Sequence, residues 1–166
     1  MRVGKAIRSI AVATLAGCVL LSACSGKGPF RQVQVCLSSP EETVAFKLVM
    51  RSVAQANGLE FFDRSIEAEA EGERIKRLLP DHLVAHPKIL ISGVRKDGVS
   101  FGAANFAEAP TQIVIGFQLG KQGAGREFSN TVAQALGERW TVREGPDPEI
   151  SGAFPLPECD KARSLG

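Results

Sequence analysis

The fold of this chain is decided by residues 88–119, which read KILISGVRKDGVSFGAANFAEAPTQIVIGFQL. Two apolar runs, Lys88–Val94 and Val99–Phe106, flank the turn residues Lys96-Asp97-Gly98, and this arrangement is typical of a β-hairpin. From Gln112 to Leu119 large apolar residues alternate with glutamine, valine and glycine, which is the period of a strand with one buried face. We therefore predict a meander of three antiparallel strands.

The residues before the meander predict two strands and two helices. Ser39-Pro40-Glu41-Glu42 has the pattern of a helix start, with Ser as N-cap, Pro at the first helical position and Glu at the third. This helix is expected to end at Asn57-Gly58, and a short strand over Leu59–Phe62 and a charged helix over Ser65–Leu79 follow it. A first strand is expected at residues 32–37, where apolar Val33, Val35 and Leu37 alternate with Gln32, Gln34 and Cys36.

The residues after the meander predict a third helix over Arg126–Glu138 and a last strand over Trp140–Arg143. Helices on one face of a mostly antiparallel sheet account for this order of elements. We predict one α+β domain, a two-layer sandwich of ferredoxin-like type. The composition agrees, because 44% of the 166 residues are hydrophobic and 23% are charged, which argues against a disordered chain.

Two surfaces are expected to be open to a protein partner. One is the acidic first part of the second helix, and the other is the sheet face that carries Gln34, Gln112 and Gln118. The first helix is instead expected to pack on the core through the apolar residues Val44, Ala45, Leu48, Val49, Val53 and Ala56. Nucleic acid is not expected as a partner, since the formal charge is only +2 and no basic stripe is present.

The N-terminal residues have the pattern of a signal peptide. Arg2, Lys5 and Arg8 form a basic region, and no charged residue occurs from Ile10 to Leu21. Twelve helical residues reach about 18 Å, which is too short to cross a hydrocarbon core of about 30 Å. We therefore expect cleavage rather than a transmembrane span.

The residues Leu21-Ser22-Ala23-Cys24 that follow resemble the lipobox of bacterial lipoproteins. The resemblance covers about 24 residues and implies that residues 1–23 are removed and that Cys24 carries acyl chains as the first residue of the mature protein. Two or more chains agree with the need for more than one signal in stable anchoring. The alternative is an ordinary secretory signal with a coincidental cysteine.

The same resemblance implies a location. The residue after Cys24 is Ser25, not the Asp that retains lipoproteins in the inner membrane of enteric-type bacteria, so we expect the outer membrane and its periplasmic side. Residues 24–31 would be the membrane tether, 32–143 the folded domain and 144–166 a Pro-rich extended tail. Removal of three basic residues with the signal lowers the formal charge from +2 to about −1.

Two cysteines are left in the mature domain, Cys36 and Cys159, once Cys18 leaves with the signal and Cys24 is acylated. An even pair in an oxidising compartment predicts a disulfide, which would fasten the C-terminal tail to the start of the domain. Two free buried thiols are the alternative.

Candidates for chemistry are few, and no cofactor is implied. His82 and His86 are spaced as on one face of a helix, but Leu83 stands where the metalloprotease motif needs Glu. We treat both, with Asp81 as a third ligand, as weak metal candidates and expect a polar turn there instead. The glycine-rich Gly120–Arg126 lacks the ending of a phosphate loop, so we expect a flexible connection.

The sequence thus predicts an envelope lipoprotein with a non-catalytic binding or structural role, held to the membrane through Cys24 and open to an envelope protein partner. An inhibitor or immunity-type lipoprotein that neutralises a toxic periplasmic enzyme is the alternative. A metal-dependent hydrolase that uses His82 and His86 is the third hypothesis. The oligomeric state does not follow from the sequence.

Overall fold

The computed structural model describes residues 29–77, 88–105 and 109–145. In chain order the helices and strands are β1 (Arg31–Cys36), α1 (Thr43–Ala56), β2 (Glu60–Asp63), α2 (Ser65–Lys76), β3 (Leu90–Val94), β4 (Val99–Asn105), β5 (Gln112–Leu119), α3 (Gly125–Gly137) and β6 (Thr141–Glu144). Short 3-10 turns, η2 (Pro40–Glu42) and η4 (Lys121–Gly123), precede α1 and α3. The predicted order of elements is therefore confirmed, and the end predicted for the second helix, Leu79, lies outside the described residues.

The strands form one six-stranded sheet in the order β2-β3-β4-β5-β1-β6, and all the paired neighbours are antiparallel. Because direction reverses at each step across the sheet, β1 runs parallel to β2, and β5 runs parallel to β6. Helix α1 connects the first pair and α3 the second, so each helix belongs to a split β-α-β unit, the pattern of ferredoxin-like folds. Here β3 and β4 widen the sheet between β2 and β5.

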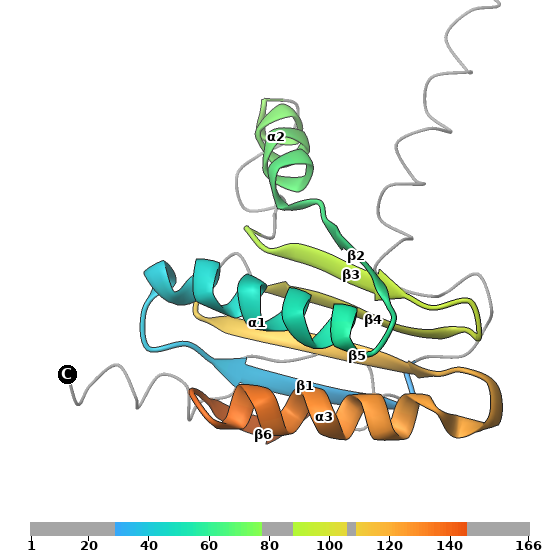
Figure 1. Cartoon of the computed structure of the whole chain (residues 1–166). Helices are drawn as coiled ribbons and strands as arrows, with labels where there is room; N and C mark the ends of the chain where they lie inside the picture. Colours follow the sequence, from blue (N-terminus) through green and yellow to red (C-terminus); the bar gives the residue numbers. More distant parts are fainter. Residues whose placement is uncertain (1–28, 78–87, 106–108, 146–166) are drawn as a thin grey trace, which may run out of the picture.

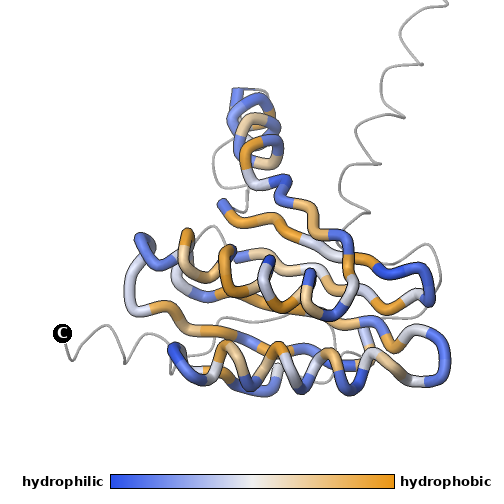
Figure 2. The backbone as a smooth tube through the Cα atoms, in the orientation of Figure 1, coloured by the Kyte–Doolittle hydropathy of each residue, from blue (hydrophilic) through white to orange (hydrophobic). Residues whose placement is uncertain are grey.

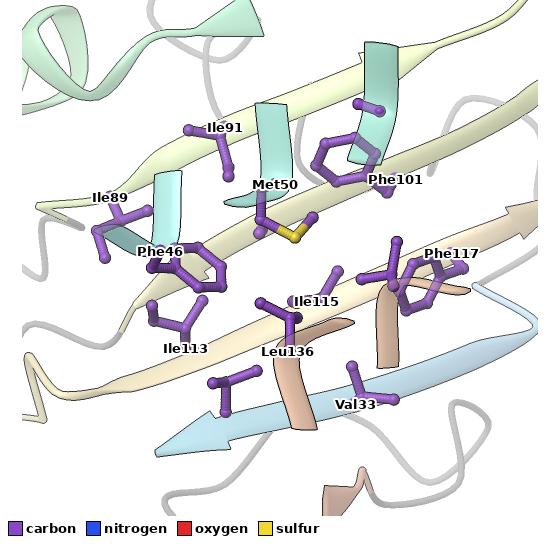
Figure 3. Close-up of a cluster of buried hydrophobic side chains, with 14 of the residues drawn as sticks. Val33, Phe46, Met50, Ile89, Ile91, Phe101, Ile113, Ile115, Phe117 and Leu136 are labelled. Atoms are coloured by element: carbon purple, nitrogen blue, oxygen red, sulfur yellow. The ribbon is translucent and has the colours of Figure 1, made fainter. Parts of the chain in front are cut away.

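Helices α1 and α3 lie side by side on one face of the sheet, and this confirms the predicted two-layer α+β sandwich (Figure 1). The core lies between the layers, where side chains of α1 and α3 meet the inward side chains of β1, β3, β4 and β5 (Figure 3). Its largest buried side chains include Phe46, Phe117 and Phe128, which are 0–2% exposed. Hydrophobic residues are concentrated in the central strands and in α1, and hydrophilic residues are concentrated in the turns (Figure 2).

Helix α2 stands out from the β2–β3 edge instead of lying on the sheet (Figure 1). Its main contacts with other described elements are with β3. Asp63 fixes its start, because the backbone N–H and the hydroxyl of Ser65 both donate to the Asp63 Oδ1 atom, at 3.1 and 2.6 Å. The Ser65 hydroxyl oxygen in turn accepts the Leu90 N–H at 3.1 Å, which ties the helix to β3.

The start of α1 differs from the predicted capping box. Ser39 makes no side-chain cap bond, and Pro40–Glu42 is a 3-10 turn. The Glu42 carboxylate does reach back, but it accepts the Ser38 N–H at 2.9 Å and also the Trp140 indole N–H at 2.8 Å. The tertiary contact with Trp140 thus draws Glu42 into a link between the start of α1 and the end of α3.

The prediction of which side of α1 is buried is partly wrong. Val44 and Leu48 are 65% and 57% exposed, whereas Phe46, Met50 and Ala54 are buried. The helix is apolar on several sides, so spacing alone does not select one face. Phe46 and Met50 offer the largest apolar surface on a line of i, i+4 and i+8, and burial of that line gains the most free energy.

The prediction that the sheet face with Gln34, Gln112 and Gln118 is open is also partly wrong. Gln34 and Gln112 point away from the helices but are only 1% and 0% exposed, and the Gln34 amide donates to the Gln112 Oε1 atom at 2.7 Å. Gln118 is half-buried. The alternation itself was predicted correctly, but exposure of the second face did not follow from it, because alternation fixes a direction and not what lies there.

Candidate functional site

Arg31, the first residue of β1, attaches the N-terminal end of the domain to α3 and β6. The Arg31 guanidinium donates to Ser129 Oγ at 3.0 Å, to Asn130 Oδ1 at 2.8 Å and, through Nε at 3.2 Å, to the Glu144 carboxylate. One side chain thereby joins β1, α3 and β6 at the end of the sheet where the chain enters it. We call this the entry end of the domain.

Two turns meet at the same end. The Lys121 N–H donates to the Asp97 carbonyl at 2.8 Å, which joins the β5–α3 connection to the β3–β4 hairpin turn. Gly120 has a φ of +64°, and a Cβ there would lie 2.7 Å from the backbone nitrogen of Val99. The Ala124 N–H is also used, since it donates to the Lys121 carbonyl at 3.3 Å. The connection predicted to be flexible is therefore held by backbone contacts, and two of its amides are already paired.

The opposite end of the helical layer carries exposed apolar side chains. Strand β1 runs away from the entry end, and α1 begins where it stops, so the first turns of α1 lie at the far end of the sheet. Val44 and Leu48 project there from the outer side of α1, one turn apart and therefore adjacent. Ile66, in the first turn of α2, is 81% exposed and follows the far end of β2. We call Val44, Leu48 and Ile66 the distal apolar residues.

A salt bridge connects α1 to the end of β2, from which the chain enters α2. Lys47 Nζ of α1 lies 3.0 Å from Asp63 Oδ2, at the end of β2 just before α2. Burial acts to raise the pKa of Asp63, but the hydrogen bonds from Ser65 and Lys47 outweigh it, and the pKa is lowered from its usual value. The carboxylate therefore stays charged and keeps the start of α2 attached to α1 at neutral pH.

The acidic helix α2 is solvated over most of its length. Glu67, Glu69 and Glu73 are exposed, and Glu71 pairs with Arg74 one turn later. The hydrogen bond from Arg74 lowers the pKa of Glu71. The structure thus places a charged surface on a protruding helix, and its use for docking stays a prediction.

Most of the predicted site residues lie outside the described residues: Cys24, Asp81, His82, His86 and Cys159. Cys36 is described, is 6% exposed and is disulfide-bonded, so of the two alternatives for this cysteine the free thiol is wrong. Its pairing with Cys159 stays a prediction.

Within residues 29–77, 88–105 and 109–145, no group of three or more His, Cys, Asp or Glu side chains is arranged to hold a metal ion. In the same ranges no helix combines the length and the hydrophobicity needed to cross a bilayer. No protein-family model matches the chain, and no curated protein matches it. The functional argument therefore rests on the lipobox and on the surfaces of the domain.

Sequence reasoning missed the distal apolar residues. Val44 and Leu48 were assigned to the core because their spacing suits a buried face. The signal that separates them from the core was present in the larger neighbours Phe46 and Met50, two residues further along in each case. A helix with two apolar faces needs a partner for the second one or leaves it in water.

Proposed function

We propose that this chain is a lipid-anchored protein of the bacterial outer membrane and that its periplasmic domain binds a protein partner. The lipobox Leu21-Ser22-Ala23-Cys24 carries the proposal, because it supplies both the anchor and the compartment. The residue after it, Ser25, supports the outer rather than the inner membrane. The role is one of binding, with the domain acting as a fixed surface near the membrane.

The short tether supports an orientation for the domain. Only six residue steps separate Cys24 from Phe30, and they span at most about 20 Å. Phe30 is already part of the fold, since its N–H donates to the Phe117 carbonyl at 3.0 Å and the Arg126 guanidinium lies 5.7 Å from its ring centre. A lipid on Cys24 therefore holds the entry end close to the membrane and leaves the other end facing the periplasm.

The distal apolar residues suit a protein partner on that outward end. Single exposed apolar side chains are ordinary, but Val44 and Leu48 are adjacent, and Ile66 adds to the same end of the domain. Burial of one Leu, Ile or Val side chain contributes about 1.5–3 kcal/mol. Charged Lys47 of α1 and Asp63 at the end of β2 supply the polar rim that such interfaces have.

A charge placed at Leu48 tests this function. We expect Leu48→Glu in the full-length lipidated protein to reduce the yield of crosslinks to the partner protein. Its thermal stability should stay unchanged, since the side chain is 57% exposed. Gln55→Glu is the matched control, because Gln55 lies on the same outer side of α1 but toward the entry end. Retention of the same partner by Leu48→Glu, or equal loss in the control, would contradict a distal binding surface.

A further inference from the structure

The sheet face opposite the helices, which we call the second face, is buried where a two-layer sandwich would leave it in water. Gln34, Cys36 and Gln112 point to this face from β1 and β5 and are 1%, 6% and 0% exposed. Thr141 and Arg143 of the neighbouring β6 point the same way and are exposed. Burial on this face is therefore deepest at β1 and at the start of β5, and no described helix lies on that side.

The floor beside these residues is shaped for a polypeptide backbone. Gly116 and Gly102 are register partners on this face and carry no side chain, which leaves space above β4 and β5. Pro29 uses part of that space, since its Cβ lies 3.3 Å from where a Cβ on Gly116 would be. The Oε1 atoms of Gln32 and Gln34 are buried on this face without a hydrogen-bond partner. Uncharged polar groups beside two glycines suit an extended peptide rather than a charged ligand.

One end of this floor contacts the C-terminal part of the chain, and the other end carries a disulfide-bonded cysteine. At one end, the Gly145 N–H donates to the Gln32 carbonyl at 2.8 Å, so the chain leaves β6 against β1. At the other end, Cys36 is disulfide-bonded. The four residue steps from Gln32 to Cys36 cover about 13 Å, and the 14 steps from Gly145 to Cys159 can span about 45 Å. The C-terminal residues are long enough to cross the floor and pair Cys159 with Cys36.

The composition of residues 146–158 fits the same place. Four prolines, at 146, 148, 155 and 157, disfavour a helix or an added central strand and favour an extended path across the face. The segment carries three acidic and no basic residues, and Arg143 projects a positive charge onto the second face. Ile150, Phe154 and Leu156 supply apolar side chains for the cover.

We propose that the second face of the sheet is the docking surface of residues 146–158 of this same chain, held there by a Cys36–Cys159 disulfide. The segment covers the Gln34–Gln112 pair and removes that part of the sheet from the surface available to other proteins. Partner binding is then confined to the helical layer and α2 while the disulfide is intact.

A photo-crosslinking amino acid at Val114 of the full chain tests the docking. Val114 is half-buried and pairs with Gln34 on the second face, whereas the control position Gln55 is exposed on the helical layer. We expect mass spectrometry to place the crosslinks from position 114 within residues 146–158 and to find none of these from position 55. Cys159→Ser should lower the yield of that crosslink at position 114.

Crosslinks from position 114 to a second copy or to another protein, or none at all, would overturn the proposal. Ala104, which is also half-buried on this face, is the second probe position if the Val114 variant fails to fold. A folded Ala104 variant without crosslinks to residues 146–158 would overturn it equally. Neither outcome depends on the lipid anchor or on a partner protein.

Discussion

Two glycines of α3 give a sharp test of how this helix packs. A Cβ on Gly125 would lie 2.3 Å from the Gln118 carbonyl oxygen and 2.9 Å from the Leu119 Cα, both backbone atoms of β5. Since contacts of this kind are normally about 3.5 Å, Gly125→Ala requires the start of α3 to move about 1 Å away from the sheet. Overpacking of this size costs about 1–3 kcal/mol.

Gly137 is the matched control at the other end of the same helix, because a Cβ there meets nothing within 4 Å. Gly137→Ala should stabilise the domain by about 0.5–1 kcal/mol, as alanine loses less backbone entropy in a helix. The two variants should therefore differ by about 3 kcal/mol, or about 10 °C in melting temperature for a domain of this size.

Circular dichroism and the fluorescence of Trp140 can follow both transitions. Trp140 is the sole tryptophan of the chain, is 5% exposed and stacks edge-to-face on Phe46 at 6.1 Å, so its emission reports the core. A Gly125→Ala protein as stable as Gly137→Ala would refute the close approach of α3 to β5.

Three further outcomes follow from the structure. Arg31→Ala should lower the free energy of unfolding by about 2 kcal/mol. Arg31→Lys should not restore it, because one ammonium group cannot reach all three acceptors. Urea unfolding measures both variants, and a loss under about 0.5 kcal/mol in Arg31→Ala would count against this role. The hydrogen bond from the Ser38 N–H lowers the pKa of Glu42 from its usual 4.5. Burial opposes this shift, and the hydrogen bond from the Trp140 indole adds to it. The contribution of Glu42 is therefore complete above that pH and lost as pH falls below it, so stability should rise between pH 3 and 6 less steeply in Glu42→Gln than in the wild type, and equal slopes would be the contrary result. Ser25→Asp should move the protein from the outer to the inner membrane fraction of an enteric host, and unchanged fractionation would argue against the sorting signal.

The order of elements could be predicted because local signals and the final packing agree. The alternation in Gln112–Leu119 became β5, the central strand between β4 and β1, with Ile113, Ile115 and Phe117 all fully buried. The polar break before Gly98 became the hairpin turn, with a φ of +87° at that glycine.

What sequence patterns could not predict was decided by contacts between distant segments. The burial of Gln34 depends on what covers the second face, and alternation in β1 carries no information about that. The choice between two apolar sides of α1 depends on which one meets the sheet, and there the larger Phe46 and Met50 exclude Val44 and Leu48. Both misses lie on surfaces to which we assign binding, in one case to a partner and in the other to the chain itself.

The lipid anchor is the central claim, and the mass of the N-terminal peptide tests it most directly. Protein purified from the envelope in detergent should begin at Cys24 and carry the mass of a thioether-linked diacylglycerol with an N-acyl chain. Blocking the lipoprotein signal peptidase should leave residues 1–23 attached. An unmodified Cys24, or a mature protein that begins at another residue, would contradict the account.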